Sequence, residues 1–265
     1  MKMWTRAWII FAIWTTASFV GSPLEQSIVL AQELPPAAAL VDRHVEAVGG
    51  RAALERHTSR HLAGSFDTQG ISGTVEVFSA APARSKIQIE IPSFGTVSIG
   101  YDGRIGWRIN PAFGPEVIEG YTLDQLKQNA NFYDPLHSEP FVVSRKTVAL
   151  TELDGRSVYK VKVKTRWDEE YFQFYDVETG RLAGTIRTYA TPVGDAETTV
   201  ILRDYEEVDG VWLPMTWVQR SAAAGEQLFK FTTAEFDQVQ ESVFELPAEI
   251  KPLLKTAESS VESYD

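Results

Sequence analysis

The sequence contains no cysteine, only four histidines and no excess of positive charge. Without cysteine the chain can form no disulfide bond, and it cannot be a lipoprotein anchored through an N-terminal cysteine. Its net charge of −11 and its pI near 4.9 argue against binding to nucleic acid and against electrostatic attachment to anionic lipid. Both of those functions need basic patches. An exported chain of this composition must rely on a hydrophobic core alone.

Sequence motifs of the common catalytic and metal sites are also missing. The chain has no GxSxG and no HExxH pattern, and Gly49-Gly50 follows a helical pattern instead of opening a phosphate-binding helix. His57 and His61 are four residues apart, but Thr58 and Ser59 interrupt the single helix that a two-histidine metal site would need. Acidic runs such as 168–170 are typical of solvated hairpin ends. We therefore expect no catalytic residue, no metal and no cofactor.

The N-terminus resembles a secretory signal peptide. Lys2 and Arg6 precede an apolar run, residues 7–21, that is somewhat shorter than the about 20 residues of a transmembrane helix. The small-residue pattern of 29–31 before Gln32 is typical of a cleavage site. We expect residues 1–31 to be a cleaved signal peptide and the mature protein to reside in the periplasm; an uncleaved membrane anchor is the alternative.

The hydrophobic pattern predicts a mostly β, α+β domain over 32–252, followed by a polar, disordered tail over 253–265. Apolar residues recur at helical spacing before Gly49-Gly50, and 51–57 reads as a second short helix. From Ser59 onward the period changes to two, with turn residues between the runs, which predicts about ten to eleven antiparallel strands. A helical stretch, 121–131, interrupts them.

Aromatic and leucine side chains gather around this interruption and in a later strand. They could line a pocket for an acyl chain, although an ordinary filled core would have the same composition. The candidate lining residues are Trp107, Phe113, Leu123, Leu126, Phe132, Phe172 and Phe174.

A series of short motifs resembles a known family, the bacterial proteins described as outer-membrane lipoprotein-sorting-like. The match runs from about residue 38 to 247. Its motifs are AVGGRAAL (47–54), GTVEVF (73–78), YDGRIGW (101–107), GPEVIEG (114–120), DGRSVYKVKV (154–163), FYDVETGRL (174–182), DYEEVDGVWLP (204–214) and VFELP (243–247). Such proteins are similar in fold to the LolA-like periplasmic lipoprotein carriers.

The resemblance implies an incomplete antiparallel β-barrel with helices covering its concave face, and a cavity that takes the acyl chains of a lipoprotein. The position of the carriers' lid-latching arginine is not evident in this sequence; Arg104 and Arg108 are candidates by location. We therefore expect a non-catalytic, monomeric carrier or binding protein whose partners are lipid or acylated protein and envelope proteins of the inner or outer membrane. An envelope scaffold that uses the concave face to bind protein is the alternative, and a hydrolase is the third.

Overall fold

A computed structural model describes residues 33–134, 136–191 and 194–254 of the chain. The predicted signal peptide and nearly all of the predicted tail lie outside these residues. In the described part, no helix is both long enough and apolar enough to cross a membrane. Residues 34–254 belong to one compact unit.

The described strands form one antiparallel sheet of thirteen strands that does not close on itself. Their order is β6-β5-β4-β3-β2-β1-β13-β12-β11-β10-β9-β8-β7, so two meanders are joined where β1 pairs with β13. The first meander comprises β1 (Ser59–Thr68), β2 (Ile71–Ala80), β3 (Arg84–Ile91), β4 (Gly95–Tyr101), β5 (Gly106–Asn110) and β6 (Gly114–Ile118).

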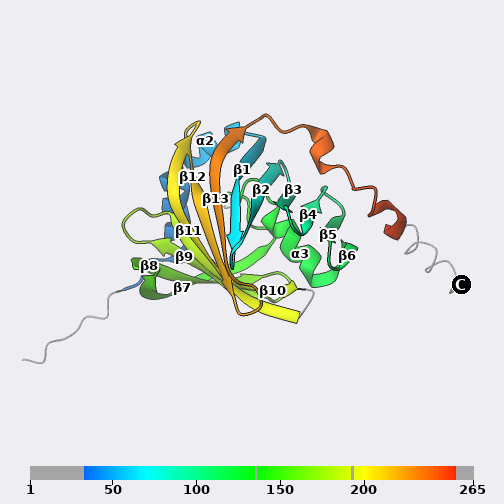
Figure 1. Cartoon of the computed structure of the whole chain (residues 1–265). Helices are drawn as coiled ribbons and strands as arrows, with labels where there is room; N and C mark the ends of the chain where they lie inside the picture. The colour runs from blue at the N-terminus through cyan, green and yellow to red at the C-terminus, as the bar shows by residue number, and fades with distance from the viewer. Residues whose placement is uncertain (1–32, 135, 192–193, 255–265) are drawn as a thin grey trace, which may run out of the picture. The chain divides into compact units, whose positions relative to one another are not determined.

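The second meander comprises β7 (Val142–Leu153), β8 (Arg156–Thr165), β9 (Glu170–Asp176), β10 (Leu182–Thr191), β11 (Gly194–Val208), β12 (Val211–Ser221) and β13 (Gly225–Phe236). The helices are α1 (Ala37–Ala47), α2 (Gly50–Arg56) and α3 (Gly120–Asn129), with a 3-10 turn at Glu241–Phe244. Figure 1 shows the strands curving, with α3 between the β5 and β10 regions.

The predicted fold class is confirmed: a mostly β, open antiparallel sheet with N-terminal helices and an inserted helix. The structure has more strands than the sequence predicted, because β5 and β6 lack the alternation of apolar and polar residues by which strands were recognised. Each has only five residues, and Gly106, Gly114 and Pro115 break its apolar pattern.

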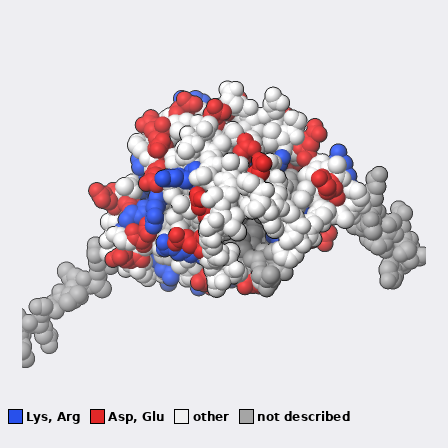
Figure 2. All heavy atoms as spheres, viewed as in Figure 1, with Lys and Arg blue, Asp and Glu red and all other residues white. Residues whose placement is uncertain are grey.

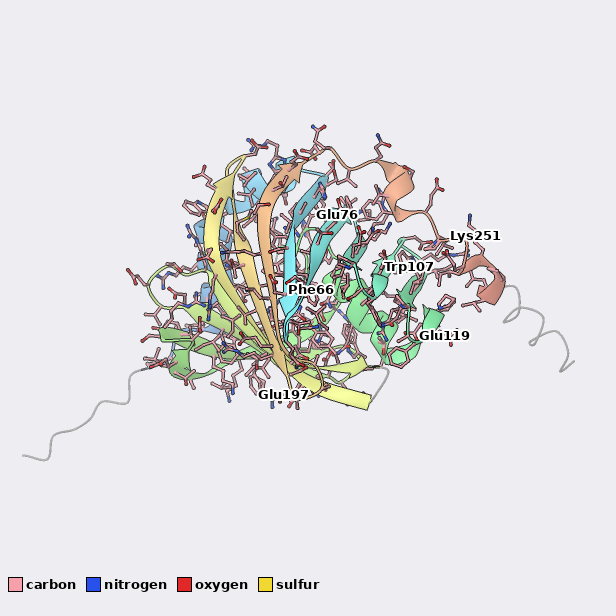
Figure 3. All side chains as sticks on the ribbon, viewed as in Figure 1. Phe66, Glu76, Trp107, Glu119, Glu197 and Lys251 are labelled. Carbon is pink, nitrogen blue, oxygen red and sulfur yellow. The ribbon has the colours of Figure 1, made fainter. Side chains whose placement is uncertain are left out.

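All three helices lie on the same face of the sheet, which we call the inner face. Leu40 of α1 packs with Tyr171 and Tyr175 of β9, and α2 packs on the cluster that contains Leu62 and Val77. The alternation of side chains along each strand assigns every second residue to this face. Figure 3 locates Phe66, a buried member of the inner-face cluster, on β1.

The Gly49-Gly50 pair ends α1 and allows a close approach. Gly49 has φ of +121°, and a Cβ built on it would lie 2.1 Å from the carbonyl oxygen of Gly210 in the β11–β12 turn. The neighbouring amide of Trp212 donates to the Val48 carbonyl at 3.0 Å. The glycines therefore stop the helix and dock it on the sheet.

Asp237, directly after β13, anchors the start of β1. Its carboxylate accepts hydrogen bonds from the backbone N–H groups of Thr58 (2.7 Å) and Ser59 (3.2 Å) and from the Thr58 hydroxyl, and it lies 2.8 Å from Nδ1 of His57. Burial opposes ionisation, but these hydrogen bonds outweigh it and lower the pKa of Asp237 to about 2.

The hydrogen bonds of Asp237 should make the free energy of unfolding depend on pH in the acidic range. Because the folded pKa is below the ordinary value of 3.8, the stabilisation is present above pH 3.8 and is lost as the pH falls toward 2. Chemical denaturation between pH 5 and 2 should show a shallower loss of stability in Asp237→Asn than in the wild type. Identical pH profiles would contradict this role.

Trp107 is buried on the side of the sheet away from the inner face, and its ring fills the space beside Gly100. A Cβ on Gly100 would lie 2.3 Å from that ring. Gly100→Val should therefore destabilise the fold by about 1–3 kcal/mol, measured as a shift of the urea midpoint. Gly70→Asn is the matched control, because Gly70 has open space around it and asparagine tolerates its positive φ. Equal midpoints for the two variants would contradict the packing.

Candidate functional site

The seven predicted lining residues do not converge on one cavity. Leu123 and Leu126 of α3 pack against β5, where a Cβ on Gly106 would lie 2.8 and 2.9 Å from their methyl carbons. Gly106 therefore faces α3, and its neighbour Trp107, only 1% exposed, points to the opposite face. Phe113 is 62% exposed, in the β5–β6 turn. Figure 3 places Trp107 in the region of β4–β6.

Phe172 and Phe174 also lie on the face opposite to α3. They alternate with Tyr171 and Gln173, which line the inner side, and they belong to a cluster with Val158 of β8. The ammonium group of Lys160 lies 3.8 Å from the centre of the Phe172 ring. Phe132 lies in the loop after α3, where its amide donates to the carbonyl of Pro82 at 3.0 Å. A ligand-lining role for the seven residues stays a prediction.

A cavity of about 220 Å³ lies where α3 meets the inner face of β9 and β10. Most of its walls are polar. They are formed by Gln128 and Asn129 of α3, Asp134, Tyr171 and Gln173 of β9, and Leu182, Thr185, Arg187 and Tyr189 of β10. Sequence reasoning assigned none of these residues to a site.

A buried ion pair supports this cavity. Arg187 and Glu169 are 4% and 6% exposed in their side chains, and they form a bidentate pair in which Arg187 Nε donates to Glu169 Oε1 at 2.7 Å. Burial by itself raises the pKa of a carboxyl group, but the hydrogen bonds and charge of Arg187 outweigh it and lower the pKa of Glu169. Glu169 is therefore an ionised acceptor and not a proton donor.

The same pair holds α3 in place. Arg187 donates to Oε1 of Gln128 at 2.9 Å and to Oδ1 of Asn129 at 3.3 Å. Gln125 donates to Glu169 at 2.8 Å and to the Thr188 carbonyl at 2.7 Å. Because Leu123 and Leu126 contact β5 on its other side, α3 bridges the two meanders across the open side of the sheet.

Three tyrosines (Tyr121, Tyr171 and Tyr189) and one carboxyl group near the ion pair have raised pKa values. Burial, followed by the charge of Asp134, raises the pKa of Tyr171 to about 12, so its hydroxyl stays protonated while it accepts from Gln128. Burial and the hydrogen bond to Glu169 raise the pKa of Tyr121 to about 12. Burial also raises the pKa of Asp134, which Arg145 and Arg187 partly oppose. The region is thus polar, and burial disfavours the charged forms of these groups.

Arg104 and Arg108 do not contact α3 in this way. Arg104 is exposed in the β4–β5 turn, and Arg108 forms an ion pair with Glu116 of β6 at 2.9 Å. Arg187 is the arginine that bonds to the inserted helix. In the sequence, Arg187 is recognisable only as a single arginine within the alternating segment 182–191. The segment does not reveal its partner Glu169, which lies in the turn between β8 and β9.

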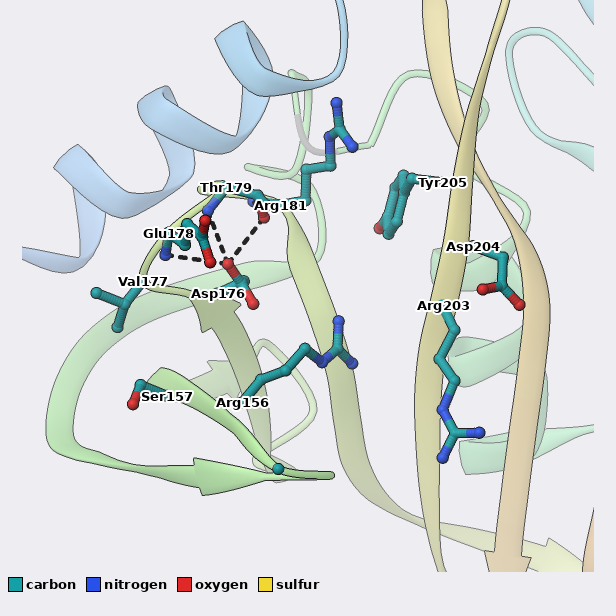
Figure 4. Close-up of a pocket in the computed structure, with 11 residues that line it drawn as sticks. Arg156, Ser157, Asp176, Val177, Glu178, Thr179, Arg181, Arg203, Asp204 and Tyr205 are labelled. Carbon is teal, nitrogen blue, oxygen red and sulfur yellow. Dashed lines mark hydrogen bonds between the residues drawn. The ribbon is translucent and has the colours of Figure 1, made fainter.

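Two larger depressions on the surface are weaker candidates for a binding site. The one in Figure 4, about 480 Å³, lies at the turns between β7–β8 and β9–β10, and its charged groups serve the fold. Asp176 accepts from the amides of Glu178 and Thr179 in its own turn, Arg203 pairs with Asp154, and Arg156 donates to two backbone carbonyls. The other, about 580 Å³, lies between α1 and β7.

His57 and His61 have separate structural contacts. His57 stacks on Phe236 beside Asp237, whereas His61 stacks on Phe78, with ring centroids 4.5 Å apart, and approaches Glu76. In the described ranges, no group of three or more His, Cys, Asp or Glu side chains could hold a metal ion. On the face shown in Figure 2, basic and acidic residues interleave on the left side, over β7–β9.

Removing one member of the buried ion pair should destabilise the protein strongly. Arg187→Met leaves Glu169 buried and unpaired, which costs about 3–5 kcal/mol, and it should increase amide hydrogen exchange in α3. The matched control is Arg203→Met, which breaks a more exposed pair with Asp154 and should cost about 0–1 kcal/mol. A loss of stability in Arg187→Met with unchanged exchange in α3 would contradict the proposed attachment of the helix.

Comparison with known proteins identifies the fold. No model of a protein family matches the sequence, and no curated protein matches it. A crystal structure of a DUF1329 family protein from Desulfovibrio piger is similar with a TM-score of 0.55 at 12% identity, covering 82% of this chain and 100% of that chain.

A LolA superfamily protein from Nitrosomonas europaea is similar with a TM-score of 0.52 at 13% identity, covering 80% of this chain and 99% of that chain. Identities this low establish the fold alone. The chain therefore has the fold that the sequence resemblance implied, the open antiparallel half-barrel of LolA-like proteins.

Proposed function

We propose that the protein is an exported, periplasmic carrier or binding protein for a lipid, an acyl chain or an acylated protein, acting without catalysis or cofactor. The observation that carries this proposal is an incompletely covered apolar surface on the inner face of the sheet. The fold comparison is consistent with it, and residues 1–31 would supply export.

The apolar surface lies on β3 and β4. Ile87 pairs with Val77 and Ile99, while Ile89 pairs with Val75 and Val97, so these side chains form two cross-strand rows on the inner face. Val75 and Val77 are buried, whereas their four partners on β3 and β4, Ile87, Ile89, Val97 and Ile99, are only half-buried. Each methylene of an acyl chain placed there would contribute about 0.8 kcal/mol.

An exposed apolar rim lies at the ends of these strands, beyond the row that contains Ile89. The β1–β2, β3–β4 and β5–β6 turns lie at the same end of the meander, and they carry Ile71, Phe94 and Phe113, which are 46%, 45% and 62% exposed. The last two turns are neighbours, because a Cβ on Gly95 would lie 3.2 Å from Pro111. This rim offers an acyl chain an apolar route to the inner face.

The way α3 is attached would allow it to move away from the inner face when a ligand binds. The buried residues of α3 are Gln125 and Gln128, so the helix meets β9 and β10 through hydrogen bonds more than through apolar area. A hydrogen bond that exchanges with water contributes about 0.5–1.5 kcal/mol net, or about 1.5–3 kcal/mol when one partner is charged, as Glu169 and Arg187 are here. Water can replace these hydrogen bonds when α3 moves, so displacement of α3 by an entering acyl chain exposes polar groups of β9 and β10 and not a large apolar area. Arg187 would serve as the latch that the carriers' arginine provides.

Occluding the inner face should abolish binding of an amphiphile while the fold persists. In titrations of the secreted protein with a dansyl-labelled undecanoic acid, Ile89→Trp should weaken binding at least about tenfold, because the indole fills the half-covered rows. Glu90→Trp, exposed on the opposite face of the same strand, is the matched control and should bind like the wild type. Circular dichroism and urea midpoints verify folding.

Two results would contradict the carrier proposal. The first is a wild-type protein that binds no amphiphile, which would favour a scaffold that binds protein on its concave face. The second is equal binding by Ile89→Trp and Glu90→Trp, which would place the ligand elsewhere.

A further inference from the structure

Arg60, at the start of β1, is a positive charge on the inner face without a partner. Its Nε atom is buried and makes no hydrogen bond, and its side chain has no ion pair or hydrogen bond with any residue that the structure describes. Burial lowers the pKa of Arg60, and no carboxylate offsets that effect. A partly desolvated charge without a partner is unfavourable, and a bound anion would relieve it.

The register places Arg60 next to the apolar rows. Arg60 pairs with Ser79 of β2 and with Phe236 of β13, Ser79 pairs with Ser85, and Ser85 pairs with Tyr101. This polar row is the inner-face row that immediately precedes the row of Leu62, Val77, Ile87 and Ile99. The inner face is therefore itself amphipathic, with arginine and hydroxyl groups at one end and the exposed apolar rim at the other.

The loop after α3 lies over this polar end. Ala83 and Asn131 form an isolated β-bridge, the amide of Phe132 donates to Pro82, and the hydroxyl of Tyr133 donates to the His57 carbonyl at 3.2 Å. Arg60 as a whole is nevertheless half-buried, and Nε is the one nitrogen of its side chain that is both buried and unbonded, so the two terminal nitrogens retain access to solvent. A head group can reach them without displacing a protein partner.

We propose that Arg60 binds the anionic head group, a carboxylate or a phosphate, of the amphiphile whose acyl chain lies along the inner face toward the rim. This inference rests on the proposed carrier function and names the class of ligand: a singly or doubly charged anionic lipid in preference to a neutral one. A guanidinium group suits both head groups because its planar N–H donors match their paired oxygens. The acidic surface of the chain does not conflict with this, because the charge lies inside the half-barrel.

The test compares dansyl-undecanoic acid with its methyl ester, two ligands that differ only in the head group. Both are titrated into the wild type, Arg60→Gln and Arg60→Lys, and an oleoyl lysophosphatidic acid, measured by displacement of the labelled acid, serves as a phosphate ligand. Arg60→Gln should weaken binding of the two anions about tenfold or more and change binding of the ester less than about twofold. Arg60→Lys should retain part of the preference because it retains the charge. Arg104→Gln, in an exposed turn, is the matched control and should leave every affinity unchanged.

The outcomes separate this inference from the carrier proposal. If the wild type binds neither acid nor ester, the carrier proposal fails and the Arg60 inference fails with it. If both bind but Arg60→Gln weakens them equally, or weakens neither, only the Arg60 inference is overturned. Millimolar inorganic phosphate should compete poorly with the labelled acid; strong competition would indicate a free-anion site instead and would also overturn it.

Discussion

The pairing of β1 with β13 is the constraint on which the rest of the structure depends. It joins residues about 170 positions apart, Arg60 with Phe236 through Thr68 with Gln227, and converts two separate meanders into one sheet. Because β6 and β7 remain unpaired with each other, the sheet curves without closing. Its inner face is therefore covered by helices. Asp237 stabilises the junction where β13 ends and β1 begins.

The covering helices differ in how they are attached, and that difference defines the site. Three of the four buried residues of α1 are apolar, such as Leu40, and they complete a core; the fourth, His44, accepts a hydrogen bond from the Leu182 amide. The buried residues of α3 are glutamines bonded to a buried Arg187–Glu169 pair. These hydrogen bonds fix the position of α3 on the sheet, while the helix buries little apolar area against β9 and β10. The half-buried aliphatic rows and Arg60 lie on the same inner face, so the cover, the apolar surface and the charge belong to one arrangement.

Much of the fold follows from local rules. The switch from helical to two-residue periodicity at Ser59, the glycine stop at Gly49-Gly50 and the turn residues between strands predicted the helices and most strands. The short strands β5 and β6 were missed because glycine and proline interrupt them. Alternation also showed that Phe172 and Phe174 share a face, yet it could not show that α3 covers the other one.

The site was less accessible to sequence reasoning because its partners are distant in the chain. Arg187 and Gln128 are 59 residues apart, and only the folded sheet brings them together. The unpartnered state of Arg60 depends equally on tertiary structure, since nothing in the segment SRHLAGSF reveals which residues lie opposite. Sequence reasoning therefore favoured aromatic residues for the site, whereas the structure draws attention to polar and aliphatic ones.

Native mass spectrometry of the protein purified directly from a Gram-negative periplasm tests the central claim most directly. The account predicts a second charge-state series, heavier by the mass of one amphiphile, which collisional activation releases as an anion. A single series at the mass of the protein alone, with a second protein co-eluting in stoichiometric amount, would contradict the account and favour a protein-binding scaffold.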